Sequence, residues 1–507
     1  MIWKGAVYPL EKHCDILVLG GGGSGMVAAA RAAERSGKRV IVLEKSKTIG
    51  GGMLFASTMR TFRSKWQEER GIPDQSNDFL RRMMDLTLWK LDPELVRNAI
   101  LGTGAFFDWY SQHELPEVLA RYEARPYVFD IPVNGQPGPQ VDGFHNGSGR
   151  LIMEAMTRLC QSLGVELLTQ HRAVDAEVTD GRITAILAQS PDGPVRITCQ
   201  VCILACGSWI CNRSVVEKVC PAFLDAEVFP NAHQNPNYTG DGLPIAEKAG
   251  ALVDWDSFCL RLMGPICSFG EQSKFDALTH TDRAILVDLN ARRFVAEPMA
   301  PRIDPFDTGH ILLQHPRGKA YFLFSANTLQ AVIDDSKANG DSPDFDPFGI
   351  PALPPLQKVD GWFRDSMAKG SKEACVAETV EELAALIGLD PVQLRATVDA
   401  YNASCAEGLD WNYFKEPASL LPLSEGPFYA LGGKLSTDGA FGGVRVDASM
   451  QAYGQDGKRV DGLYVTGDFA SGRHIVLGGI KKQVLNDMSW ALSSGFLAGT
   501  SAADALA

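Results

Sequence analysis

Three glycines and one acid stand at spacings that suit the phosphates and the ribose of a nucleotide. Gly20, Gly22 and Gly25 form a Gly-x-Gly-x-x-Gly turn, and Glu44 follows about 20 residues later. Glycines let the backbone approach a pyrophosphate, and a helix that begins at such a turn offers free N–H groups to phosphates. A carboxylate at this distance can bind a pair of ribose hydroxyls. The four residues together predict a dinucleotide site.

The segment 14–45 also contains the elements that must position these residues. An apolar run precedes the glycines, an Ala-rich helical pattern follows them, and a second apolar run ends at Glu44. This order predicts a βαβ unit with the turn at the end of its first strand. The alternative is an ordinary βαβ turn that binds no nucleotide. In that case Glu44 stands at this spacing by chance.

Composition indicates a globular protein with room for more than one domain. The chain has 507 residues, of which 45% are hydrophobic and 21% are charged. This length predicts two or more domains. The net charge of −13 argues against nucleic acid or an anionic membrane as the main partner.

The sequence offers no targeting or membrane signal. No basic segment followed by an apolar core stands at the N-terminus, and no run of about 18 apolar residues occurs. We therefore expect no signal peptide, no membrane span and a cytoplasmic location.

Eleven cysteines are scattered along the chain, with one cluster at Cys199, Cys202, Cys206 and Cys211. Short spacings of this kind can hold an iron–sulfur cluster. However, Cys202 and Cys206 lie on an apolar strand pattern that would separate them by roughly 13 Å. We expect core thiols and no metal.

Further patterns predict the domain organisation. Residues 165–207 suggest a run of strands, with turns at Asp180-Gly181 and Asp192-Gly193, and residues 376–405 suggest two helices. The C-terminal segment 462–505 reads as a strand, a glycine turn and a long helix. We predict an α/β fold, with a Rossmann-like domain formed by 1–256 and 428–507 and an inserted α+β capping domain at 257–427.

Four motifs in this order resemble the flavoproteins of the fumarate reductase/succinate dehydrogenase superfamily, which includes urocanate reductases and 3-ketosteroid dehydrogenases. The motifs are GGGGSG…LEKS…GGGMLFAST at 20–58, ILACGSW at 203–209, TGDG at 239–242 and GLYVTGD at 462–468. The resemblance spans nearly the whole chain and implies FAD as cofactor. The binding is expected to be non-covalent, because FASTM lacks the histidine to which some relatives attach FAD.

The resemblance also implies which residues bind FAD. Gly20, Gly22, Ser24 and Gly25 are expected to bind the pyrophosphate, and Glu44 is expected to bind the adenosine ribose. Residues expected along the diphosphate and the flavin are Lys45, Gly51, Gly52, Ser57 and Thr58. Val174 is expected to contact adenine through its backbone, and Ala205 and Gly207 are expected to close the adenosine pocket. Asp241, Gly467, Asp468, Gly479 and Ile480 complete the set.

The chain departs from fumarate reductases where these bind a dicarboxylate. Arg293 and Glu297 match an Arg-Phe-x-x-Glu motif, and we expect them to form an ion pair. The proton-donating arginine falls at Pro301, one residue before Arg302. Gly439 replaces a histidine, and RHIVLGGIKK lacks the expected Asn-Arg-Leu. A simple fumarate reductase is therefore not expected.

Several residues remain as catalytic candidates, each with a plainer alternative. Arg302 is the first candidate for proton donor, and the alternative is a structural arginine. Arg473 and His474 follow the flavin-facing turn and can meet substrate, while Tyr238 can point its phenol at the cavity or pack as a core aromatic. Further candidates are His145, His233, His310, Lys481 and Lys482; the alternative for the two lysines is the basic start of a helix.

The predicted function is that of an FAD-dependent oxidoreductase acting on CH–CH bonds. It would reduce an activated C=C bond of a small organic substrate, or catalyse the reverse dehydrogenation. The alternatives are a 3-ketosteroid-type dehydrogenase and a flavoprotein that relays electrons to a partner. Electrons would come from or go to an external donor or acceptor, and the oligomeric state stays open.

Overall fold

A computed structural model of the chain divides into two compact units. The first unit comprises residues 1–219, 232–260 and 440–507, and the second comprises 220–231 and 261–439. The predicted boundaries of the FAD-binding and capping domains stay a prediction. The structure describes residues 10–56, 59–119, 125–128, 140–143, 148–228, 236–267, 272–279, 281–298, 308–339, 352–477, 480–483, 485 and 487–507.

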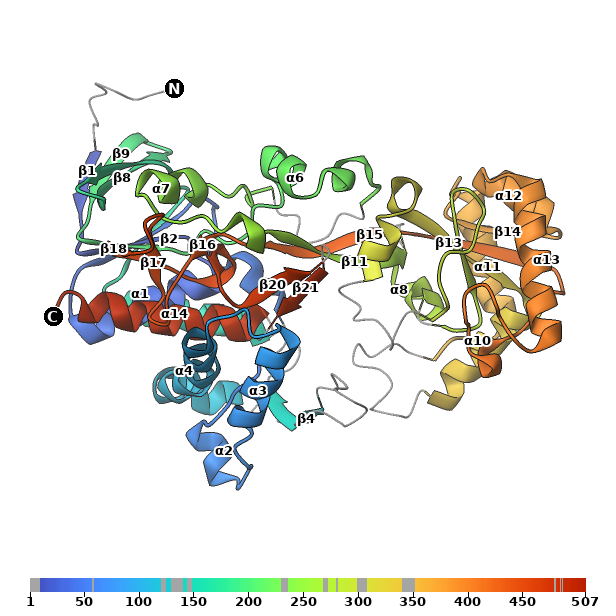
Figure 1. Cartoon of the computed structure of the whole chain (residues 1–507), viewed down its shortest axis with the longest axis horizontal. Coiled ribbons are helices and arrows are strands. Elements are labelled where there is room, and N and C mark those ends of the chain that lie inside the picture. The colour runs from blue at the N-terminus through green and yellow to red at the C-terminus, as the bar shows by residue number, and fades with distance from the viewer. Residues whose placement is uncertain are drawn as a thin grey trace. The chain divides into compact units, whose positions relative to one another are not determined.

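A six-stranded sheet forms the centre of the first unit (Figure 1). Its strands run in the order β17 (Gln451–Tyr453), β18 (Arg459–Val465), β10 (Val201–Leu204), β2 (Ile16–Leu19), β3 (Val40–Glu44) and β6 (Glu166–Thr169). All neighbours from β18 to β6 pair in parallel, while β17 is antiparallel to β18. Strands β2, β3 and β10 are wholly buried, as their continuous apolar sequences predict for parallel strands covered on both faces.

Helix α1 (Gly23–Ser36) connects β2 to β3 and packs closely against the C-terminal helix α14 (Asp487–Asp504). Small residues make this approach possible: an added Cβ at Gly499 would lie 2.9 Å from the Cα of Ala28. The other helices of the unit include α4 (Pro93–Leu119) and α5 (Ser148–Ser162). Asp92 caps the start of α4, because its carboxylate accepts a hydrogen bond of 2.8 Å from the N–H of Glu94.

A four-stranded sheet in the order β1-β9-β8-β7 completes the first unit. It contains β1 (Leu10–His13), β7 (Arg172–Thr179), β8 (Arg182–Ser190) and β9 (Gly193–Thr198). The predicted turn at Asp180-Gly181 joins β7 to β8, and both residues adopt positive φ, of 51° and 76°. Two successive positive φ values define the tight turn whose twist matches a hairpin. The second turn is shifted by one residue from the prediction: Pro191 and Asp192 form it, because Gly193 already pairs with Ser190 as the first residue of β9.

The second unit holds a sheet of β11 (Cys259–Cys267), β15 (Phe428–Phe441), β13 (Lys319–Ser325) and β12 (Ile285–Asp288), with β14 (Ala374–Ala377) also paired to β15. Alternate residues of β13 enter different cores. Phe322 and Phe324 pack with helices α10 (Ala326–Asn339) and α11 (Leu356–Ala368). Tyr321 and Leu323 pack with α12 (Val380–Ile387) and α13 (Pro391–Glu407). Helices therefore cover both faces of this sheet.

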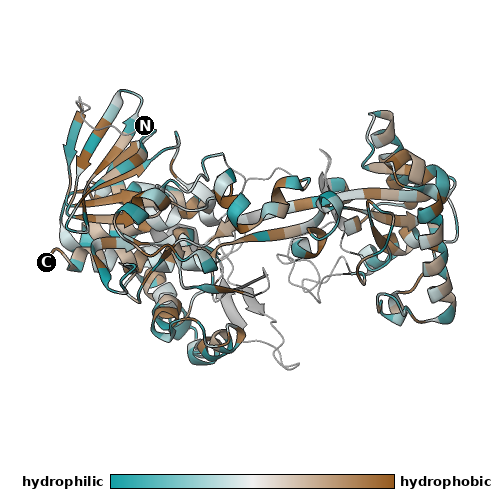
Figure 2. Ribbon diagram, turned by 45° about the horizontal axis from the view of Figure 1, so that its top comes forward, coloured by the Kyte–Doolittle hydropathy of each residue, from teal (hydrophilic) through white to brown (hydrophobic). Residues whose placement is uncertain are grey.

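Hydropathy follows this layering. Figure 2 shows hydrophobic and hydrophilic residues alternating along the helices of the second unit, as expected for helices with one face on a sheet. Helices α12 and α13 confirm the two helices predicted within 376–405. The α/β fold class is confirmed.

The C-terminal segment differs from the prediction in one respect. Between the turn after β18 and helix α14, the chain forms β19 (Ala470–Ser471) and a hairpin of β20 (His474–Leu477) and β21 (Ile480–Gln483). The hairpin places Lys481 and Lys482 in a strand, so their interpretation as a helix start is wrong. No helix within the described ranges is long and apolar enough to cross a membrane.

Candidate functional site: the glycine turn and its surroundings

The glycine turn lies at the carboxyl end of β2, between β3 and β10. The N–H of Gly20 donates to the carbonyl of Leu43 at 2.8 Å, and the N–H of Ala205 donates to the carbonyl of Leu19 at 2.8 Å. Gly20 has a φ of 116°, and a Cβ there would collide with the carbonyl oxygen of Ala205. A Cβ at Gly25 would collide in turn with the carbonyl oxygen of Gly20. Side chains are excluded here because three backbone segments touch.

The N-terminus of α1 is open to an anion. Gly22 caps this helix without a side-chain hydrogen bond, and no acid stands in its first turn. Gly22 also forms a bridge with Gly50, and a Cβ at Gly51 would lie 3.3 Å from the Cα of Gly22. Free N–H groups and the helix dipole favour a phosphate at such a terminus, and the glycines leave room for it.

Glu44 is fixed at the end of β3 by backbone donors. Its carboxylate accepts hydrogen bonds from the N–H groups of Gly21, at 2.9 Å, and Ser46, at 2.7 Å. The residue is only 9% exposed. Each carboxylate oxygen can accept a further bond, so Glu44 retains capacity for ribose hydroxyls. Val174, predicted at the adenine through its backbone, lies on β7 with a side chain that is 43% exposed.

Lys45 and Asp241 bind each other. Lys45 Nζ lies 2.9 Å from the Asp241 carboxylate and 2.8 Å from Thr239 Oγ1. Arg172 holds the same carboxylate with two hydrogen bonds of 2.9 and 2.8 Å. Burial alone would raise the pKa of Asp241, but the hydrogen bonds from Arg172 and Lys45 outweigh it and lower that pKa. This ion cluster joins the end of β3 to the turn before α7 (Gly242–Lys248).

The predicted flavin-facing turn follows β18 and is held by α14. The indole N–H of Trp490 donates to the carbonyl of Gly467 at 2.8 Å, and the N–H of Gly467 donates to Ser494 Oγ at 3.1 Å. A Cβ at Gly467 would lie 2.5 Å from the hydroxyl of Ser24 on α1. The turn therefore lies directly against the start of α1, as a shared cofactor site requires.

Arg473 is buried between two acids. Its guanidinium lies 2.7 Å from Asp468 and 3.0 Å from Asp487, and its side chain is 1% exposed. The guanidinium also lies over the ring of Phe441, 4.6 Å from its centroid. Two carboxylates thus neutralise Arg473 within the first unit.

His474 is buried as well, with 3% exposure. Its Nε2–H donates to the carbonyl of Ser257 at 2.7 Å, which fixes the orientation of the ring. Phe441 packs edge-on against the ring. These contacts suit a positioned scaffold histidine, and its catalytic role stays a prediction.

The remaining predicted residues are distributed unevenly. Tyr238 and Gly52 face each other in the first unit. Gly207 follows β10, and an added Cβ there would have no atom of the described part of the chain within 4 Å. Ile480 lies in β21, and His310 lies on α9 (Thr308–Leu312). Ser57, Thr58, His145, His233, Arg302 and Gly479 lie outside the described residues.

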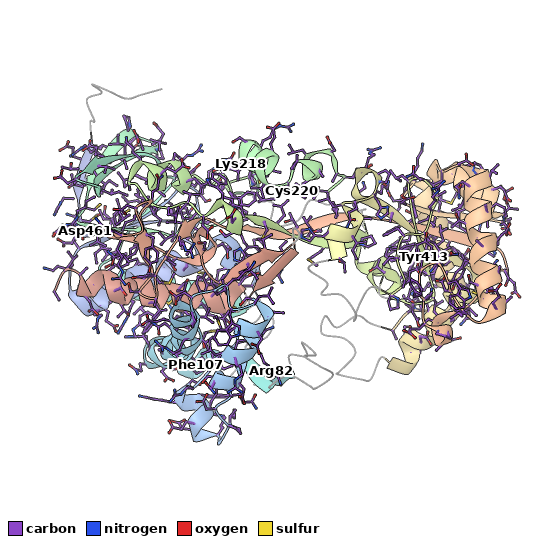
Figure 3. All side chains as sticks on the ribbon, viewed as in Figure 1. Arg82, Phe107, Lys218, Cys220, Tyr413 and Asp461 are labelled. Carbon is purple, nitrogen blue, oxygen red and sulfur yellow. The ribbon has the colours of Figure 1, made fainter. Side chains whose placement is uncertain are left out.

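In the second unit, Arg293 and Glu297 form the predicted ion pair, with 2.7 Å between Arg293 Nη2 and Glu297. Asp410 lies 3.0 Å from the guanidinium, and Lys415 lies 3.6 Å from Glu297. The exposed fractions of these four side chains are 4%, 0%, 0% and 0%. Tyr413, labelled in Figure 3, donates to the carbonyl of Arg293 at 2.5 Å. We call Arg293, Glu297, Asp410 and Lys415 the sealed ion cluster.

The cysteine cluster is mostly core. Cys199 and Cys202 are buried free thiols and Cys206 is half-buried, but Cys211 is exposed, so its assignment to the core is wrong. Burial raises the pKa of the Cys206 thiol to about 12. Among the residues that the structure describes, no group of three His, Cys, Asp or Glu side chains is arranged to hold a metal ion.

Sequence reasoning missed the residues that position the site from a distance. Arg172, Asp487, Trp490 and Ser494 belong to no glycine motif, and only the folded chain brings them to the turns. The sequence does offer a signal for Trp209, because this residue ends the motif ILACGSW. Its indole N–H is buried and has no partner within the described part of the chain.

These features define a class of protein: an α/β protein with a dinucleotide site at the carboxyl ends of parallel strands. A family model described as an FAD binding domain matches residues 15–477. The chain therefore belongs to this FAD-binding family, and FAD is its cofactor. The glycine turn, the open start of α1 and the spare capacity of Glu44 fit that group.

Relatives extend the comparison. Vinyl phenol reductase of Lactiplantibacillus plantarum is 24% identical over 483 residues, which cover 91% of each chain. Urocanate reductase of Eggerthella lenta is 25% identical, over 91% of this chain and 70% of the relative. NADH:acrylate oxidoreductase of Vibrio harveyi is 25% identical, over 98% of this chain and 51% of the relative. The chain thus spans only about half the length of that last relative.

Solved structures share the fold. The open conformation of a flavocytochrome c3 fumarate reductase has a TM-score of 0.69 at 20% identity, over 98% of this chain and 79% of the other. A 3-ketosteroid-Δ4-(5α)-dehydrogenase of Rhodococcus jostii RHA1 has a TM-score of 0.66 at 21% identity, over 98% of both chains. The predictions of the superfamily, of FAD and of an FAD-dependent oxidoreductase are confirmed.

Proposed function

We propose that this FAD-dependent oxidoreductase reduces an activated C=C bond of a small organic substrate that is not a dicarboxylate. The observation that carries the proposal is the similarity to vinyl phenol reductase over 91% of both chains. Urocanate reductase and NADH:acrylate oxidoreductase, whose names also point to unsaturated compounds, support the same class of reaction.

The state of Arg473 supports a substrate without paired carboxylates. Arg473 is the arginine that follows the predicted flavin-facing turn. Asp468 and Asp487 already pair with it, and burial leaves it little contact with solvent. An arginine neutralised in this way has little attraction left for a second anion. Gly439, which stands where fumarate reductases have a histidine, has no side chain that could donate to a carboxylate, and its N–H donates to Thr437 Oγ1 at 3.2 Å.

The chain must also provide a proton. FAD supplies hydride chemistry when bound, and reduction of C=C requires a proton on the neighbouring carbon. Arg302 is our proposed donor. The variant Arg302→Ala is expected to lower kcat by about 10²- to 10⁴-fold, the contribution of a positioned acid, with unchanged FAD content. Wild-type turnover in this variant would remove Arg302 from the mechanism.

The test of the reaction uses reduced holoprotein under anaerobic conditions. The protein is photoreduced and mixed in a stopped-flow instrument with 4-vinylphenol, acrylate, urocanate, an enone and fumarate, while flavin absorbance is followed. We expect reoxidation by at least one acceptor other than fumarate. A flavin that stays reduced with every acceptor, or that reacts only with a partner protein, would contradict the proposal and favour a dehydrogenase or an electron relay.

Two finer features belong to the same proposal. The electrons come from an external donor, and the protein works in the cytoplasm, as its sequence suggests. A cell fraction with a low-potential donor that reduces the flavin would support the first. Recovery of the native protein from the soluble cytoplasmic fraction would support the second.

A further inference from the structure

The hydroxyl of Tyr238 is a buried polar group without a partner. Its oxygen is inaccessible to solvent and makes no hydrogen bond to any residue that the structure describes. Buried phenols normally find an acceptor, and a buried hydroxyl left unsatisfied destabilises the fold. Such a group in a predicted cofactor site calls for a ligand atom as its partner.

Its position is fixed from both sides. The carbonyl of Tyr238 accepts a hydrogen bond of 2.8 Å from the N–H of Cys211. The preceding residue, Asn237, donates from its side chain to Ser46 Oγ at 3.0 Å. The following residue, Thr239, accepts from Lys45 Nζ at 2.8 Å. The loop thus holds the phenol beside the end of β3.

The phenol points at the glycine segment that lies beside α1. Tyr238 Oη would be 3.2 Å from a Cβ at Gly52, so this glycine leaves space in front of the hydroxyl. The adjacent Gly51 approaches the Cα of Gly22, which caps α1. The hydroxyl therefore lies next to the segment that adjoins the anion-binding helix start.

Electrostatics make this group a donor. Burial, together with the charges of Asp468 and Glu44, raises the pKa of Tyr238 to about 12. The phenol stays protonated near neutral pH and offers one O–H. Neither acid accepts it, although both lie close enough to affect it. An anionic oxygen at the start of α1 would satisfy it.

We propose that Tyr238 is a cofactor-binding residue whose hydroxyl donates to the diphosphate of FAD, rather than an acid of the substrate site. The inference depends on FAD being the cofactor and is independent of the reaction proposed above. Nothing in the glycine motifs required a tyrosine at this position, so it adds a side-chain donor to a site otherwise built from backbone.

The test compares holoprotein with the variant Tyr238→Phe. Dilution of each protein releases FAD, and the rise in flavin fluorescence gives the Kd. We expect the Kd to increase about tenfold, the share of one hydrogen bond to a charged acceptor. The rate of flavin reoxidation is measured separately with FAD-saturated variant, using the acceptor that reoxidises wild type fastest. The control Tyr464→Phe removes the hydroxyl of a buried tyrosine on β18 and should leave the Kd for FAD unchanged.

Competition locates the contact on FAD. If Tyr238 binds the diphosphate, adenosine should displace FAD from the variant about tenfold more readily than from wild type, because only FAD is weakened. ADP, which carries a diphosphate, should displace FAD equally well from both proteins. An unchanged Kd with a rate of flavin reoxidation that falls more than hundredfold would overturn the proposal in favour of a catalytic acid. Equal gains for adenosine and ADP would place the contact away from the diphosphate and overturn it as well.

Discussion

The two units each contain a group of polar side chains, and the groups differ in whether these side chains are already paired with other residues. In the sealed ion cluster of the second unit, Arg293, Glu297, Asp410 and Lys415 are almost wholly buried and paired with one another. In the first unit, Glu44 is held by backbone N–H groups, while the hydroxyl of Tyr238 and the indole of Trp209 have no hydrogen-bond partner among the residues that the structure describes.

The difference separates structure from function. Burial lowers the pKa of Lys415, and nearby Glu297 opposes this effect, so the lysine depends on its acid. A cluster whose charges are buried and paired has no polar atoms left to bind a ligand. The Tyr238 hydroxyl, which has no partner among the described residues and lies near the start of α1, can bind one. Polar atoms with unused hydrogen-bonding capacity therefore identify the binding site, and the number of charged residues does not.

The largest effect is expected when the sealed ion cluster is broken. Glu297→Gln leaves Arg293 and Lys415 with less compensation inside the second unit, and unfolding free energy should fall by about 3–5 kcal/mol. Denaturant unfolding of the holoprotein measures it. The control Asp399→Asn breaks an exposed pair with Arg395 and should change stability by less than about 0.5 kcal/mol. Equal losses in both variants would refute the distinction between sealed and exposed charges.

The next effect concerns the glycine turn. Gly25→Ala introduces a Cβ that collides with the carbonyl oxygen of Gly20, so the turn must shift. We expect a loss of about 1–3 kcal/mol of stability and little or no bound FAD after purification. Absorbance of the flavin per mole of protein reports the latter.

The matched control is Gly361→Ala in α11, where no atom of the described residues lies within 4 Å of the added Cβ. Alanine favours a helix over glycine by about 0.5–1 kcal/mol, so this variant should be slightly more stable and retain its FAD. Normal FAD content in Gly25→Ala would show that the close contact at the turn is not needed.

The smallest effect is a pH dependence of the ion cluster around Asp241. Its folded-state pKa is lowered, so its contribution to stability is present above the unfolded-state pKa of about 3.9 and is lost as pH falls through the folded value. Asp241→Asn should cost about 1 kcal/mol at neutral pH, since the pairs are partly exposed.

Thermal unfolding between pH 7 and pH 3 checks this prediction. The difference between wild type and Asp241→Asn should shrink below the unfolded-state pKa of about 3.9, because the carboxylate of the unfolded chain takes up a proton there while the lowered pKa of the folded carboxylate keeps it ionised. A constant difference across this range would mean that the ion pairs with Lys45 and Arg172 are not its source.

Local patterns predicted much of this molecule. The βαβ unit at 14–45 and the hairpin turn at Asp180-Gly181 depend on residues close in sequence, and both occur. The glycine turn and Glu44 lie together because one strand and one helix separate them. These elements were readable because their physical causes are short-range.

Long-range pairing escaped prediction. Lys45 meets Asp241 and Arg473 meets Asp487 only after distant segments have folded onto one sheet edge. The hairpin of β20 and β21 interrupts a segment whose turn and helix signals suggested direct continuity. The sequence alone shows which residues are charged. It does not show which polar groups keep hydrogen-bonding capacity for a ligand once the chain has folded.

The most direct test of the central claim is the product of a single turnover. Photoreduced holoprotein is mixed anaerobically with one equivalent, relative to FAD, of the acceptor that reoxidises it fastest, and the product is identified by mass spectrometry. The account predicts one mole of product per mole of FAD, heavier than the acceptor by two hydrogens at the former C=C bond. Oxidised flavin with the acceptor recovered unchanged would contradict it.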